Sequence, residues 1–135
     1  MQCKRPNGKQ ILLATAMILM VFAFTNIAFA DSPKMDLKVG DEAYVCGCGP
    51  SCDCMTMSMK PGECVCNKPL VKAKVAYTEG DWAVMKIPEG DSGFRLQAFK
   101  TVGKYACACG EGCDCNTRSQ KPGKCVCGRD MKKVE

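Results

Sequence analysis

Apolar and polar side chains alternate through the middle of the chain, and this alternation predicts β-strands. The clearest stretch has an apolar residue at every second position with lysines between them: Val71, Ala73, Val75 and Tyr77, separated by Lys72 and Lys74. Successive side chains of a strand point to opposite faces of a sheet. We therefore expect the four apolar residues on one face and the two lysines on the other.

Turn-forming residues divide this region into three such runs. After the first run, Glu79-Gly80-Asp81 is expected to form a turn, residues 82–87 a second strand, residues 88–93 a loop and residues 94–102 a third strand. Outside the first thirty residues, no segment has the period or length of a helix. The pattern predicts a small all-β fold with a three- to four-stranded antiparallel meander.

Two further expectations concern this meander. Residues 37–39, which precede Gly40-Asp41, are a candidate for an additional edge strand. Trp82, Phe94 and Phe99 are expected to pack in the core, because single aromatic residues on strands usually do so.

The first thirty residues have the pattern of a secretory signal peptide. A basic start is followed by an apolar run at residues 11–24 and by Ala28-Phe29-Ala30, the small-x-small motif that precedes a cleavage site. We expect cleavage after Ala30, which predicts a periplasmic or secreted protein without a stable membrane anchor. The alternative is an uncleaved anchor, since residues 11–30 are just long enough to span a bilayer.

The most informative feature is an internal repeat. Residues 44–66 and 105–127 align without a gap at an offset of 61, and 15 of the 23 positions are identical. The shared pattern is Y-x-C-x-C-G-x-x-C-D-C-x-T-x-S-x-K-P-G-x-C-V-C. The chain is therefore expected to consist of a signal peptide (1–30), an N-terminal segment or edge strand (31–43), cysteine module 1 (44–66), the meander (67–104), cysteine module 2 (105–127) and a tail (128–135).

Each module contains six cysteines arranged as three C-x-C pairs, which we predict to be metal ligands: Cys46, Cys48, Cys52, Cys54, Cys64, Cys66, Cys107, Cys109, Cys113, Cys115, Cys125 and Cys127. In an extended segment, residues two apart point the same way, so each pair presents two sulfurs on one side. Sulfurs about 3.8 Å apart suit tetrahedral Zn²⁺ with bonds of about 2.3 Å, whereas a disulfide within one pair would be strained.

The number of cysteines leaves the kind of site open. Six thiolates exceed the four that one tetrahedral ion uses, so a module holds either a small cluster with bridging sulfurs or one ion and a redundant pair. Cu(I) and Zn(II) both suit thiolate ligands, and the absence of histidine from the whole sequence favours Cu(I). Two Zn²⁺ or four Cu⁺ would leave a net charge of −2 per module, which nearby lysines such as Lys60 can offset.

Residues between the cysteine pairs carry further expectations. Lys60-Pro61-Gly62-Glu63 has Pro and Gly at the positions that a type II turn requires. Asp53 and Asp114 are expected to form turns. Methionines alternate through module 1, but module 2 has other residues at these positions, so they are at most an accessory site of module 1: Met55, Met57 and Met59 against Asn116, Arg118 and Gln120.

Charge argues against a nucleic-acid partner. The chain carries 19 Lys and Arg against 14 Asp and Glu. Three of these bases lie in the predicted signal, so the mature chain would have 16 against 14, a net charge of +2. It also lacks a basic run with interleaved aromatic residues. Cysteine content, and not charge, decides the class of protein.

Two segments of each module resemble a known family. Tyr44-Val45-Cys46 with residues 60–64, and Tyr105-Ala106-Cys107 with residues 121–128, are similar to the small heavy-metal-binding domain of copper-efflux ATPases and related efflux proteins. That family reads Y-x-C-P-M-H-P and then K-P-G-x-C-P-x-C-G-M. The chain lacks its Met-His and has C-x-C for C-x-x-C, and this C-x-C density is similar to that of metallothioneins. The resemblance implies an exported or membrane-facing protein that handles metal.

Together these patterns predict an exported, non-enzymatic protein that binds soft metal ions for sequestration, delivery or resistance, with a metal transporter or metallochaperone as a candidate partner. One alternative is a disulfide-stapled structural or interaction protein, because export compartments are oxidising and twelve cysteines is an even number. A second is a thiol-disulfide redox protein, which normally uses one reactive pair on a βαβ frame.

Overall fold

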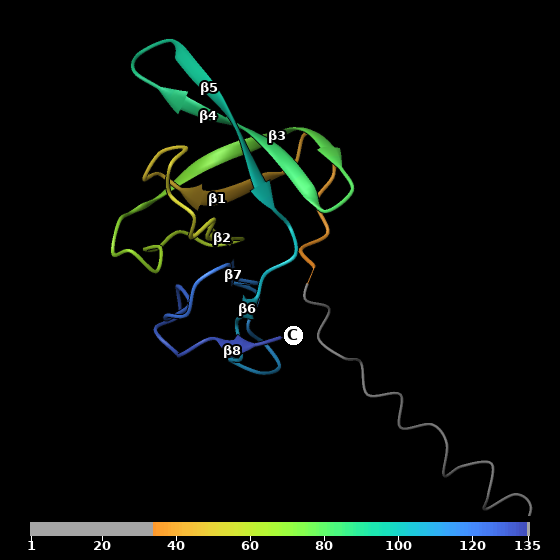
Figure 1. Ribbon diagram of the computed structural model, residues 1–135, viewed down its shortest axis with the longest axis vertical. Coiled ribbons are helices and arrows are strands. Elements are labelled where there is room, and N and C mark those ends of the chain that lie inside the picture. Colours follow the sequence, from red (N-terminus) through yellow and green to blue (C-terminus); the bar gives the residue numbers. More distant parts are fainter. Residues whose placement is uncertain (1–33, 135) are drawn as a thin grey trace, which may run out of the picture. The chain divides into compact units, whose positions relative to one another are not determined.

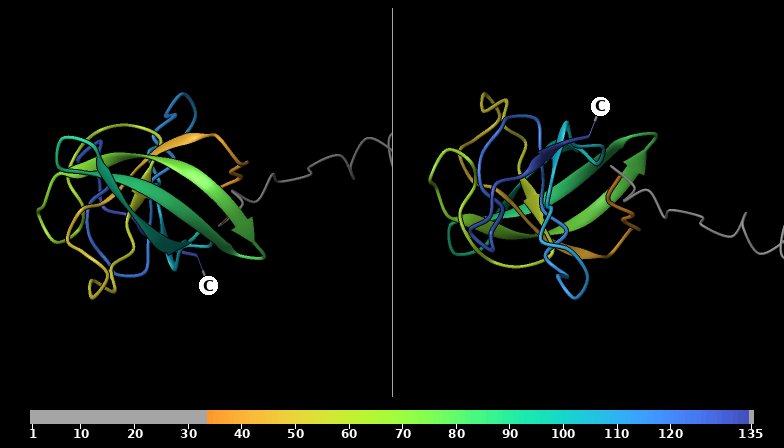
Figure 2. Two further views of the ribbon diagram at one scale, coloured as in Figure 1. Left: turned by 90° about the horizontal axis from the view of Figure 1, so that it is seen from above. Right: turned by 90° about the horizontal axis from the view of Figure 1, so that it is seen from below.

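Antiparallel strands form a single sheet in the computed structural model, which describes residues 34–134 (Figure 1). The strands are β1 (Glu42–Cys46), β2 (Met57–Ser58), β3 (Leu70–Glu79), β4 (Trp82–Glu89), β5 (Gly93–Lys100), β6 (Tyr105–Ala106), β7 (Arg118–Ser119) and β8 (Lys132–Lys133). Their order in the sheet is β5-β4-β3-β1-β2-β7-β6-β8. The predicted all-β class with an antiparallel meander is confirmed, and β3, β4 and β5 are its long, curved strands (Figure 2).

Alternate residues of the long strands build the core. Ala83, Met85 and Ile87 of β4 are buried, and they pack with buried residues of the neighbouring strands: Ala43, Val45, Ala73, Val75 and Phe99. The expected alternation fails at Tyr77. The register between β3 and β4 shifts between Val75 and Tyr77, so Tyr77 lies opposite Val84 and is exposed. A β-bulge inserts one residue and reverses the face on which later side chains lie.

The strand boundaries also differ from the expected ones. β4 continues through Pro88, which lies opposite Phe94 of β5, beyond the last residue of β4 that pairs with β3. On the side of β3 the missing N–H of Pro88 therefore costs no hydrogen bond in the ladder. Residues 37–39 form no strand, and the first strand of the described region is instead β1, in the interior of the sheet between β3 and β2.

Of the three aromatic residues expected in the core, only Phe99 is buried. Trp82 and Phe94 are 38% and 52% exposed. The ammonium group of Lys86 lies 3.8 Å from the centre of the Phe94 ring, and that of Lys100 lies 5.6 Å from the Trp82 ring. Cation–π contacts of this kind partly cover aromatic rings on the solvent face of a sheet.

The two modules flank the meander in sequence but are neighbours in the sheet. β2 of module 1 pairs with β7 of module 2 through Met57 and Arg118 (Figure 1). The predicted tail, residues 128–135, contributes β8. Lys133 of β8 pairs with Tyr105, just as Lys72 of β3 pairs with Tyr44 in the first copy. The structural repeat therefore extends beyond the second module's last cysteine.

The predicted signal peptide, residues 1–30, lies outside the described residues, which belong to one compact unit, residues 32–135. Within the described part of the chain, no helix is long and apolar enough to cross a membrane.

Candidate metal centres

The chain folds each module so that its three C-x-C pairs meet. In module 1, β1 ends at Cys46, and the amide N–H of Cys46 donates to the carbonyl oxygen of Thr56 at 2.9 Å. Gly49, with φ of +101°, reverses the chain between the first two pairs. That backbone conformation favours glycine, which explains why the second copy has Gly110 at the same position, with φ of +84°.

The sulfur atoms of module 1 lie close together without being bonded. Cys46 Sγ is 3.8 Å from Cys52 Sγ, and Cys52 Sγ is 3.4 Å from Cys54 Sγ. Cys48 Sγ lies 3.8 Å from Cys64 Sγ, and Cys52 Sγ lies 3.9 Å from Cys66 Sγ. A disulfide bond is only about 2.05 Å long. All twelve cysteines of the described residues are free.

These sulfurs form overlapping groups of three, and within each group all atoms lie within 4.8 Å of one another. In module 1 the groups include Cys46, Cys48 and Cys52; Cys46, Cys54 and Cys64; Cys48, Cys64 and Cys66; and Cys52, Cys54 and Cys66. All six predicted ligands of this module are thus brought into one cluster.

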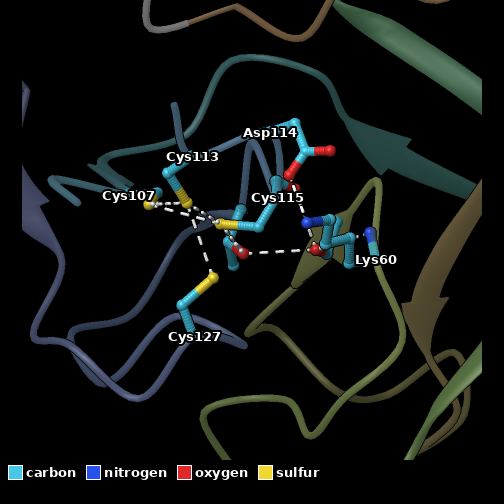
Figure 3. Close-up of polar contacts among 8 residues, drawn as sticks. Lys60, Cys107, Cys113, Asp114, Cys115 and Cys127 are labelled. Atoms are coloured by element: carbon cyan, nitrogen blue, oxygen red, sulfur yellow. Dashed lines mark hydrogen bonds and ion pairs between the residues drawn. The ribbon is translucent and has the colours of Figure 1, made fainter. Parts of the chain in front are cut away.

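Module 2 repeats the arrangement. Cys113 Sγ lies 3.8 Å from Cys107 Sγ, 3.4 Å from Cys115 Sγ and 3.5 Å from Cys127 Sγ. Cys109 Sγ lies 3.4 Å from Cys125 Sγ, and Cys107, Cys109 and Cys113 form a group of three like those of module 1. Figure 3 shows four of these side chains with their sulfurs directed toward one another.

Each cluster has a buried side and an exposed rim. Cys46, Cys54 and Cys64 are buried in module 1, whereas Cys48 and Cys66 are exposed. In module 2 the corresponding exposed residue is Cys127, and Cys115 and Cys125 are buried. The exposed sulfurs are therefore the part of each cluster that solvent or another molecule can reach.

The neighbouring sulfurs shift one another's pKa. A hydrogen bond from the Cys46 thiol lowers the pKa of Cys54 to about 4, and the same contact together with burial raises the pKa of Cys46. The backbone N–H of Cys115 and the Cys115 side chain lower the pKa of Cys113 to about 6. Some sulfurs are thus thiolates at neutral pH, the form that ligates metal, while others must lose a proton when metal binds.

The two modules hold one another through reciprocal backbone contacts. The amide N–H of Met59 donates to the carbonyl oxygen of Cys115, and that of Gln120 donates to the carbonyl oxygen of Cys54, both at 2.8 Å. Gln120 and Met59 occupy equivalent positions of the two modules, as do Cys115 and Cys54, so the two contacts are equivalent. This is expected of two copies that face each other across an approximate two-fold axis.

Buried hydroxyl groups repeat this relation. Ser58 donates to the carbonyl oxygen of Cys115 at 2.9 Å, and Ser119 donates to that of Cys54 at 3.1 Å. The hydroxyls of Thr56 and Thr117 donate to Cys54 Sγ and Cys115 Sγ within their own modules, each at 3.4 Å. No role was predicted for these four residues, although the T-x-S of the shared pattern was a signal for them.

Charged residues also pair across the interface. Lys60 of module 1 forms an ion pair with Asp114, which lies between Cys113 and Cys115 (Figure 3). Lys121 forms the equivalent pair with Asp53. Asp114 raises the pKa of Lys60, and the nearby thiols of module 2 add to this shift. The lysine of each K-P-G segment therefore lies beside the other module's cluster, not its own.

The predicted type II turn at residues 60–63 is wrong, because Gly62 does not have the positive φ that this turn requires. Glycine is needed there for close packing instead. A Cβ atom at Gly62 would lie 2.7 Å from Cβ of Val126, and one at Gly123 would lie 2.7 Å from Cγ1 of Val65. Both glycines allow the modules to touch.

The methionines of module 1 do not share one environment. Met57 is completely buried in the core, whereas Met59 is 41% exposed. Met55 has a φ of +44° and its counterpart Asn116 has +45°, so the two copies have the same backbone conformation despite different side chains.

No protein-family model matches this chain, and no match was found among curated proteins or among solved structures. The repeat and the geometry of its sulfurs are therefore the basis for any assignment of function.

Proposed function

We propose that this protein is an exported, non-enzymatic carrier of soft metal ions, which it holds through thiolates in its two modules. The observation that carries the proposal is the convergence of six sulfurs per module into groups of three within 4.8 Å of one another. Sulfurs at this separation can share an ion, and thiolates select Cu(I) and Zn(II). The protein has no histidine to add a borderline ligand.

The exposed cysteines would allow a bound metal ion to be passed to another protein. Because Cys48, Cys66 and Cys127 are exposed, a metal transporter or metallochaperone can approach the bound ion and compete for it with its own thiolates. Sequestration, delivery and resistance all need an ion that is held tightly but can be passed on. The apolar N-terminal run would bring this carrier to the periplasm or the exterior.

The test is to purify the protein from the export compartment and measure its intact mass under native and denaturing conditions. The proposal expects cleavage after Ala30, added mass from metal in the native spectrum, and twelve cysteines that react with an alkylating reagent after acid releases the metal. A mass twelve protons lower, with no metal and no reactive thiols, would instead support the disulfide-stapled protein.

The redox alternative is tested on the same sample. A thiol-disulfide oxidoreductase would show one pair that alternates between the oxidised and reduced states and would reduce a disulfide substrate catalytically. A metal carrier would reduce such a substrate no faster than free thiols do, and loading with metal would abolish even this reaction.

A further inference from the structure

The groups of three sulfurs in module 1 have a regular relation to one another. Among the sulfur triangles with all sides within 4.8 Å, the four groups named above together contain each sulfur twice and no pair of sulfurs more than once. The groups therefore join every sulfur to all the others except one, and the pairs that they leave out are Cys46 with Cys66, Cys48 with Cys54, and Cys52 with Cys64. Six points related in this way are the corners of an octahedron, and the four groups are alternate faces of it.

The sulfur contacts in module 2 obey the same relation. Its close pairs connect Cys113 to Cys107, Cys115 and Cys127, and Cys109 to Cys125. Shifted by 61 residues, every one of these pairs joins two sulfurs that share a group in module 1. The contacts of module 2 therefore fit the same octahedral arrangement of sulfurs.

An octahedral cage does not offer a tetrahedral site. Any choice of four corners of an octahedron includes at least one pair of opposite corners, so four corners cannot all be neighbours as a tetrahedron requires. Structural Zn²⁺ is almost always bound by four ligands in a tetrahedron. The cage would have to rearrange to hold Zn²⁺ in this way.

Each face, in contrast, suits an ion with three ligands. An ion at the centre of a triangle of sulfurs with sides of 3.8 Å lies about 2.2 Å from each sulfur, close to the usual metal–thiolate bond of about 2.3 Å. Cu(I) accepts three thiolates in a plane and prefers soft sulfur ligands. Four monovalent ions on six thiolates leave a charge of −2, whereas four divalent ions would leave +2.

We propose that each module is a cage for four Cu(I) ions, each bound by one group of three thiolates, with every sulfur bridging two ions. The proposal rests on the metal-binding function proposed above and adds to it the identity of the ion, the number of ions and their arrangement. On loading, thiols lose their protons, each sulfur donates electron pairs to two ions, and copper stays in the +1 state.

The geometry also implies how the cage fills. Because every sulfur bridges two ions, each Cu(I) that binds orients ligands for its neighbours. A module is therefore expected to fill in an all-or-none manner, so that empty and four-copper modules dominate over partly filled ones.

The experiment is an anaerobic titration of the reduced mature protein with Cu(I), supplied as its acetonitrile complex, followed by native mass spectrometry and X-ray absorption. We expect dominant species with about four and about eight copper ions per chain, three sulfur neighbours per copper, and a short copper–copper scattering path that an isolated ion lacks. Copper bound at one or two per module, filled stepwise and without this path, would overturn the cage and leave the metal-binding function intact. A protein that binds neither Cu(I) nor Zn(II) would overturn both.

A pair of sulfur variants sharpens the test. Cys66→Ser removes an exposed sulfur that belongs to two groups, so the fold should persist while module 1 loses at least two of its coppers and its all-or-none filling. If Cys66 were part of a redundant pair beside one four-ligand ion, this variant would bind as much copper as the wild type. Met59→Leu, which removes another partly exposed sulfur of the same module, should leave the copper count unchanged.

Discussion

Each module contains six cysteines in the same pattern, but the two modules pack against hydrophobic clusters of different size. The buried cysteines of module 1 belong to a core cluster of fifteen buried residues that includes Met85 and Phe99 of the meander. Those of module 2, Cys115 and Cys125, belong to a cluster with one further buried residue, Met131, against which partly buried side chains such as Tyr105 and Val126 pack. Cys46 is buried, whereas its counterpart Cys107 is only partly so. The same six cysteines are thus supported by a large core in one copy and by few buried side chains in the other.

The largest expected effect follows removal of metal. Structural metal in small domains contributes on the order of 10 kcal/mol to folding when no large core exists. After chelation, the amides of residues 107–128 should exchange with deuterium much faster, while those of β3 and β4 should stay protected. Hydrogen exchange with mass spectrometry of the loaded and stripped protein measures this difference. Equal loss of protection in both modules would show that the meander does not stabilise module 1.

Phe99→Ala should remove the advantage of module 1. Phe99 is completely buried in the core that includes Cys46, Cys54 and Cys64, and truncation of a buried Phe costs about 3–5 kcal/mol. Urea unfolding of the metal-free protein should show this loss, and module 1 should then exchange as fast as module 2. Phe94→Ala is the matched control, because Phe94 is exposed on the same strand and should cost little. If module 1 kept its protection in Phe99→Ala, the comparison between the modules would be wrong.

The fold class could be predicted because alternation and turn residues are local signals. The strand expected at residues 82–87 is present within β4. The bulge before Tyr77 could not be predicted in this way, because it depends on the register between β3 and β4. The exposure of Trp82 and Phe94 could not be predicted either, because their rings are partly covered by Lys100 and Lys86 from neighbouring strands. Periodicity alone does not show which face a strand presents after a bulge.

The sulfurs of the site could also be predicted, because two copies with the same six cysteines show which positions matter. The contacts between the copies could not. Gly62 was expected to form a turn, and Lys60 was expected to offset the negative charge of its own module. Both residues instead contact module 2. A repeat shows which residues two modules share but not that each copy uses them to hold the other.

Gly62→Ala and Gly123→Ala test this mutual contact. Each added methyl group would lie 2.7 Å from a valine side chain of the other module, and overpacking of this kind typically costs about 1–3 kcal/mol. Because the two contacts are reciprocal, both variants should lower the free energy of unfolding by similar amounts and should speed exchange in both modules.

A third glycine provides the control for this pair. A methyl group at Gly47 would lie 2.8 Å from Cγ2 of Val71 on β3, away from the contact between the modules. Gly47→Ala should therefore disturb module 1 and leave module 2 unchanged. If Gly62→Ala behaved like Gly47→Ala, the modules would be independent despite their contact.

The smallest expected effect concerns the ion pairs between the modules. Lys60 and Asp114 have side chains that are 48% and 73% exposed, so their pairing is screened by water and salt and contributes little to stability. Lys60→Met should nevertheless weaken copper binding in module 2, by less than about tenfold, because it removes a cation beside that negatively charged cluster.

Lys121→Met should act in the same way on module 1, and in both variants the difference from wild type should fade as the salt concentration rises. Competition with a Cu(I) chelator, read for each module by hydrogen exchange, measures the change. Lys68→Met is the control, since Lys68 is an exposed lysine two residues after Cys66, the last cysteine of module 1 itself. If Lys60→Met instead lowered the Cu(I) affinity of module 1, each lysine would act on the cluster of its own module. The remaining difference between the modules would then be the size of the hydrophobic core against which each one packs.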